Sequence, residues 1–95
     1  MGMDQALEVV EGGKRQEIAT WRKDYDVHEI IVNVVVGLPR GPATRWSAHC
    51  ELTFAQIIRV EQLLGWLCPE ADLAFLQKAK AAFTRGAKVV YTADS

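Results

Sequence analysis

The chain has 95 residues, of which 49% are hydrophobic and 24% charged, and its formal net charge is −1. This size bounds the chain to a single domain spanning 1–95, with a modest core that needs neither disulfides nor metal. The composition excludes wholesale disorder, and the near-neutral charge gives no electrostatic footprint for a nucleic-acid partner.

The longest apolar run covers residues 30–36 and is broken by Asn33. It is far shorter than the roughly 20 residues that a membrane-spanning helix needs, so we expect no membrane partner and a cytoplasmic location. Cys50 and Cys68 fit reduced thiols in that compartment. We expect Cys50 to be buried and Cys68, at a predicted helix start, to be the more accessible thiol.

The N-terminal segments are predicted to form a short helix followed by an extended segment. Asp4–Glu11 has an N-cap candidate in Asp4, and Gly12 and Gly13 are placed to stop a helix after Glu11. Lys14–Asp26 is compatible with a strand or with a helix. The double glycine and the high charge density favour a strand or extended arm.

The central segment is predicted to form an antiparallel hairpin. His28–Val36 has one apolar face and a second face that is half apolar, which is typical of an interior strand. Arg45–Leu52 alternates strictly, so this strand has one wet face. Gly37–Thr44 is rich in glycine and proline and forms the connecting loop. The apolar side of the second strand consists of Trp46, Ala48, Cys50 and Leu52.

A helix is predicted to follow this hairpin. Thr53 opens it as a capping box with Gln56, and Gly65 is placed to close it as a left-handed C-cap. The side chains predicted to face the core are Phe54, Ile57, Ile58, Val60 and Leu64.

A second main helix and a last strand complete the chain. Pro69 suits a first helical position and Gly86 a helix end. The apolar stripe between them consists of Leu73, Leu76, Ala79 and Phe83. The segment 89–92 is β-branched and aromatic, so it is predicted to return to the sheet.

Together these elements predict an α+β fold. We expect a small antiparallel or mixed sheet of three or four strands, with two main helices packed on one face, the one that carries Trp46 and Cys50.

No motif for catalysis, a metal or a cofactor is specific in this sequence. His49 and Cys50 are adjacent, so they point to opposite faces of a strand and cannot act as a base and nucleophile. His28 and Cys50 share a face across the predicted hairpin, and a pair satisfied within the core is favoured over a catalytic dyad. The two cysteines and two histidines lack metal-ligand spacing. We therefore expect no enzyme activity and no cofactor.

Three segments carry a resemblance to a known family. EIIVN at Glu29–Asn33, ELTFAQII at Glu51–Ile58 and the terminal GAKVVYTADS resemble the first strand, the strand-to-helix junction and the last strand of bacterial ubiquitin-like β-grasp domains of the multiubiquitin type. The resemblance covers about a quarter of the chain and implies a protein modifier or adaptor. The chain ends in Ala-Asp-Ser, where a modifier usually presents a glycine-containing tail.

The function favoured by these observations is a small non-catalytic protein-interaction module of the adaptor or inhibitor type, acting through a sheet face or edge. Its partner is a protein, with a homodimer among the candidates. A ubiquitin-like modifier is one alternative. A small-molecule-binding or enzymatic domain on the polar hairpin face is another. The predicted interface residues are Leu38, Arg40, Arg45, Trp46, His49 and Glu51.

Overall fold

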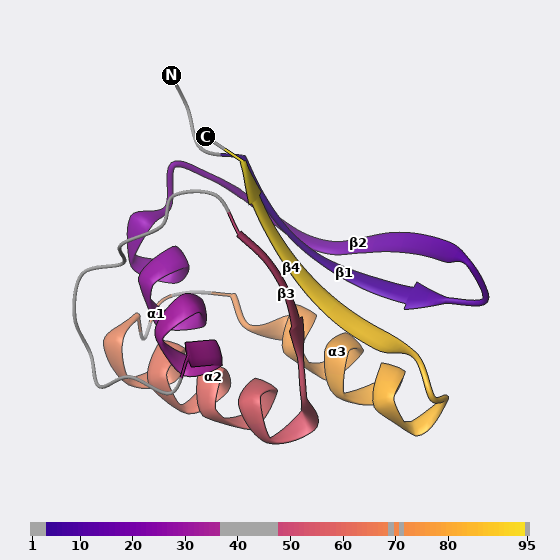
Figure 1. Ribbon diagram of the computed structural model, residues 1–95. Helices are drawn as coiled ribbons and strands as arrows, with labels where there is room; N and C mark the ends of the chain where they lie inside the picture. The colour runs from indigo at the N-terminus through magenta and orange to yellow at the C-terminus, as the bar shows by residue number, and fades with distance from the viewer. Residues whose placement is uncertain (1–3, 37–47, 69, 71, 95) are drawn as a thin grey trace.

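The computed structural model describes residues 4–36, 48–68, 70 and 72–94, and these form a four-stranded sheet with three helices (Figure 1). The element order is β1 (Asp4–Glu11), β2 (Lys14–Arg22), α1 (Tyr25–Val36), β3 (Ala48–Leu52), α2 (Phe54–Leu67), α3 (Ala74–Thr84) and β4 (Lys88–Asp94).

The strands lie in the order β2-β1-β4-β3, and every neighbouring pair is antiparallel. Figure 1 shows the three helices on one side of this sheet. The predicted α+β class, with an antiparallel sheet of four strands, is confirmed. The helical layer contains one helix more than the two main helices expected, because α1 occupies a segment that was predicted to be a strand.

The predicted helix at Asp4–Glu11 is wrong, because this segment is strand β1. Its apolar residues alternate between the two faces of the sheet, with Leu7 and Val9 buried on the helical side. Gly12 and Gly13 have φ angles of 58° and 78° and form the two-residue turn to β2. Positive φ at both positions is the signature of the tight turn that suits a twisted hairpin. The glycine pair is therefore a hairpin signal rather than a helix stop.

Strand β2 confirms the favoured extended form of the segment after this turn. The register shifts after Leu7, which lies opposite Ala19, whereas Glu8 lies opposite Glu17. Ile18 is thus the extra residue of a β-bulge, which bends an edge strand and increases its twist.

The predicted strand at His28–Val36 is also wrong, because these residues belong to helix α1. Asp24 caps this helix: its Oδ1 accepts from the Val27 backbone N–H at 3.2 Å, and its carbonyl accepts from the His28 N–H at 3.1 Å. An apolar run of this kind suits a buried helix as well as a buried strand. The predicted hairpin is therefore absent, and β3 pairs with β4 instead.

Strand β3 confirms the extended form of the predicted second strand over Ala48–Leu52. The rest of that segment and the loop Gly37–Thr44 lie outside the described residues.

Helix α2 begins with the predicted capping box. The Gln56 N–H donates to Thr53 Oγ1 at 3.2 Å, and the Thr53 N–H donates to Gln56 Oε1 at 2.8 Å. The predicted C-cap at Gly65 is wrong, because the helix continues to Leu67 and Cys68 caps it by donating to the Leu64 carbonyl at 2.8 Å. Phe54, predicted to face the core, is 49% exposed.

Cys68 accordingly lies at the end of a helix, not at the start of one as predicted, and both cysteines are half-buried. Helix α3 begins at Ala74 rather than at Pro69, and the Ala74 N–H donates to Asp72 Oδ1 at 3.0 Å. Gly86, with φ of 75°, ends it as predicted.

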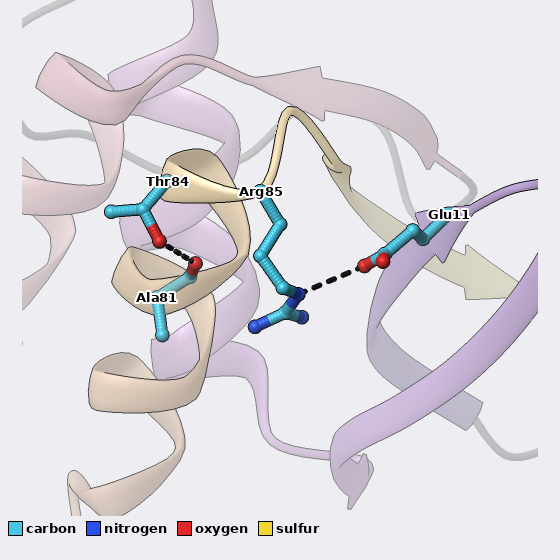
Figure 2. Close-up of polar contacts among 4 residues, drawn as sticks. All are labelled: Glu11, Ala81, Thr84 and Arg85. Carbon is cyan, nitrogen blue, oxygen red and sulfur yellow. Dashed lines mark hydrogen bonds and ion pairs between the residues drawn. The ribbon is translucent and has the colours of Figure 1, made fainter.

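The turn after α3 is tied to the β1–β2 hairpin by an ion pair. Figure 2 shows the Arg85 side chain reaching Glu11, the last residue of β1, with Nε and Oε2 3.0 Å apart. In the last turn of α3, the Thr84 hydroxyl donates to the Ala81 carbonyl (Figure 2). The end of β1, at the turn of the hairpin, is thus linked to the C-terminal end of α3.

Candidate functional site

The sheet has one face packed on the helices and one face that no described helix covers (Figure 1). We call the second face the open face. Cross-strand register and alternation assign its side chains. They are Asp4, Ala6, Glu8 and Val10 of β1, Arg15, Glu17, Thr20 and Arg22 of β2, Lys88, Val90, Thr92 and Asp94 of β4, and His49 and Glu51 of β3.

The centre of the open face mixes apolar and charged side chains. Ala6 and Val10 of β1 are half-buried, and Val90 of β4 is only 6% exposed. Glu8 lies between Ala6 and Val10 along β1, and Val90 lies directly opposite Glu8 on one side and Glu51 on the other. The open face therefore offers small apolar contacts at Ala6 and Val10 within a largely charged surface.

Ion pairs between neighbouring strands surround this centre. Glu8 and Arg15 approach to 3.8 Å, Asp4 and Arg22 to 3.9 Å, and Glu51 and Lys88 to 3.8 Å. Pairs as exposed as the last two contribute about 0–1 kcal/mol each to stability. Their charges thus remain available to a binding partner.

The open face is acidic overall. Its positions carry five carboxylates against three lysine and arginine side chains. Near the N-terminal end of β1, a shallow hollow is lined by Asp4, Ala6, Thr20, Trp21, Arg22 and Thr92, among others.

The structure places two of the six predicted interface residues on the open face. His49 and Glu51 are exposed there, on strand β3. Leu38, Arg40, Arg45 and Trp46 lie outside the described residues.

A buried polar cluster lies on the opposite, helical side of the sheet. Gln5 Nε2 donates to the Asp24 carbonyl at 2.9 Å and to the Tyr91 hydroxyl at 3.1 Å, and Gln5 Oε1 accepts from the Asp24 N–H at 2.8 Å. The Tyr91 hydroxyl and His28 Nδ1 share a hydrogen bond of 2.8 Å. Burial raises the pKa of Tyr91 to about 12, so the hydroxyl keeps its proton.

This cluster bears on the predicted pairing of His28 with Cys50. His28 is fully buried and contacts Tyr91, and Cys50 lies directly opposite Tyr91 in the sheet. Tyr91 and Gln5 were missed by the sequence reasoning. In a strand, Gln5 lies on the same face as Leu7, two residues away, and is therefore predicted to be buried. This prediction can be made only once the segment is known to be a strand.

Among the described residues, no cluster of three or more histidine, cysteine or carboxylate side chains is suited to hold a metal ion. Within the same residues, no helix is both long and apolar enough to cross a bilayer. Comparison with protein-family models, with curated proteins and with solved structures found no match.

The three segments that carry the ubiquitin-like resemblance lie in different kinds of element. Glu29–Asn33 is helical, in α1, where the resemblance implies a strand. Glu51–Ile58 spans the junction of β3 and α2, and the terminal segment contains strand β4.

Proposed function

We propose that this protein is a non-catalytic interaction module, of the adaptor or inhibitor type, that binds a partner protein through its open face. One observation carries the proposal: all three described helices pack on one side of the sheet, and the other side presents accessible Ala6 and Val10 among charged side chains, with no described helix over them. Charged side chains on such a face favour a partner of complementary charge.

The charge of the open face defines the partner's chemistry. With carboxylates in excess, it favours a partner protein whose contact surface is rich in lysine and arginine. We propose that this module acts in the cytoplasm, where its two thiols would stay reduced.

The test uses one substitution at two sites. Ala6 lies at the centre of the open face, and Ala81 is exposed on α3. Partners are captured with the wild-type protein, purified, and titrated with Ala6→Glu and with Ala81→Glu. We expect Ala6→Glu to weaken binding by about 2 kcal/mol or more, as for a central interface residue, and Ala81→Glu to leave it unchanged.

The contrary result is binding through the helical side. Trp66 on α2 is 75% exposed and is the most exposed large apolar side chain described. Binding that survives Ala6→Glu but is lost in Trp66→Ala would assign the contact to the helical side and refute the proposal. Chemical denaturation of each variant checks that it is folded.

Two alternatives have their own tests. If the chain were a ubiquitin-like modifier, mass spectrometry of captured complexes would reveal a C-terminal covalent link. If the chain bound a small molecule, the shallow hollow beside Trp21 and Arg22 would be the place for it. A rise in melting temperature with a metabolite, lost in Arg22→Ala, would support that function.

A further inference from the structure

The described sheet has two edge strands, β2 and β3, whose outward backbone groups have no neighbouring strand among the described residues. An open edge is a template for pairing with another strand, and proteins protect edges with charge and with bulges. The two edges of this sheet differ in both respects.

Strand β2 is a protected edge. It contains the bulge at Ile18. An antiparallel pairing of two β2 strands about Ile18 would place Lys14 opposite the partner's Arg22, and like charges directly opposite are destabilising. This edge therefore disfavours pairing with a second copy.

Strand β3 has the opposite character. Its five residues include no proline and no lysine, and its register with β4 is regular. An antiparallel pairing of two β3 strands about Cys50 places His49 opposite the partner's Glu51 and Glu51 opposite the partner's His49. Each pair combines a carboxylate with an imidazole, both exposed on the open face, and such pairs are favourable across strands.

We propose that two copies of this chain associate through β3, antiparallel, with a two-fold axis at Cys50. The axis is perpendicular to the sheet, so both helical layers lie on one side and the two open faces form one continuous surface. This association involves the sheet edge rather than the centre of the open face, and it does not depend on the partner interaction proposed above.

The charge arrangement is tested with a matched pair of substitutions at exposed His49. His49→Lys puts a cation opposite the partner's Glu51, whereas His49→Glu creates two carboxylate pairs per dimer. Sedimentation equilibrium should show a dimer for the wild type and for His49→Lys, and a dissociation constant about tenfold or more higher for His49→Glu. A wild type that stays monomeric up to roughly 1 mM, or equal constants for the two variants, would overturn the proposal.

The position of the axis has an independent test. Directly opposed residues in antiparallel strands have Cα atoms about 4.5–5.5 Å apart, within the range of a disulfide. Diamide takes up the two hydrogens that the two thiols lose. It should convert Cys68→Ser, which keeps Cys50, into a covalent dimer that forms more slowly when His49→Glu is added. Covalent dimer from Cys50→Ser at an equal or greater rate would contradict this axis.

The dimer and the partner interaction can fail separately. Ala6→Glu lies away from β3, on β1, and should leave the dimer dissociation constant unchanged while it weakens partner binding. Loss of both properties in Ala6→Glu would contradict the separation of the two surfaces.

Discussion

At the scale of single residues, the Tyr91 hydroxyl joins three elements. It accepts a hydrogen bond from Gln5 of β1 and shares one with His28 of α1, while Tyr91 itself belongs to β4. Gln5 also bonds the backbone of Asp24, which caps α1. This cluster therefore fixes where α1 begins relative to the sheet.

We predict that Tyr91→Phe destabilises the fold by about 1–3 kcal/mol, because it removes the hydroxyl that bonds His28 Nδ1 and Gln5 Nε2 in the core. Urea denaturation measures the free energy of unfolding. An unfolding free energy that is the same in Tyr91→Phe as in the wild type would contradict the role given to the cluster.

The pKa of Tyr91 predicts a loss of stability in alkali. Folding raises this pKa from 10.0 to about 12 because the buried phenol resists ionisation. The contribution is fully present below pH 10 and is lost as the pH rises through the folded pKa. The advantage of the wild type over Tyr91→Phe in unfolding free energy should therefore fall by about 2–3 kcal/mol over this range, so that the variant becomes as stable as the wild type or more stable. A constant difference would contradict the burial of the phenol.

At the scale of elements, the position of Gly65 in α2 predicts whether its substitution by alanine raises or lowers the stability of the protein. It lies inside α2, and a Cβ built there would meet only Leu73 Cδ1 at 4.0 Å. Gly65→Ala should therefore stabilise the protein by about 0.5–1 kcal/mol. Gly86→Ala is the matched control, because φ of 75° makes the same change unfavourable there. Thermal unfolding of both variants measures these effects. Destabilisation by Gly65→Ala would indicate that Gly65 is a left-handed C-cap and would contradict its place inside the helix.

The elements that sequence reasoning predicted correctly carry local signals. The capping box at Thr53 and the glycine at the end of α3 are satisfied within a few residues of chain. The errors fall where local signals are degenerate. Asp4–Glu11 fits a helix by its end residues and a strand by its alternation, and His28–Val36 fits either structure, so tertiary packing decided both.

The candidate site was predictable only in part, for the same reason. The alternation of β3 placed His49 and Glu51 on an outward face correctly, because alternation is local. The remainder of the open face comes from β1, β2 and β4, and β1 meets β4 across nearly the whole chain. Glu8 of β1 becomes a neighbour of Val90, which itself lies opposite Glu51, only through that long-range pairing.

At the scale of the whole molecule, the two faces of the sheet should differ in their contribution to stability. Ile57 and Leu76 are fully buried on the helical side. Truncation of either to alanine should cost about 2–5 kcal/mol. Val10→Ala on the open face should cost about 1 kcal/mol or less, because Val10 is half-buried. Chemical denaturation measures all three, and similar costs on both sides would show that the open face is part of a core.

The most direct test of the central claim is to map where a partner touches the molecule by methyl NMR. The methyl groups of Ala6, Val10 and Val90 report on the open face, and those of Ala74 and Ala81 report on the exposed side of α3. During titration with a captured and purified partner, binding through the open face predicts changes in methyl chemical shift at the first three residues and none at the two alanines of α3. Shifts confined to Ala74 and Ala81 would contradict the assignment of function to the open face.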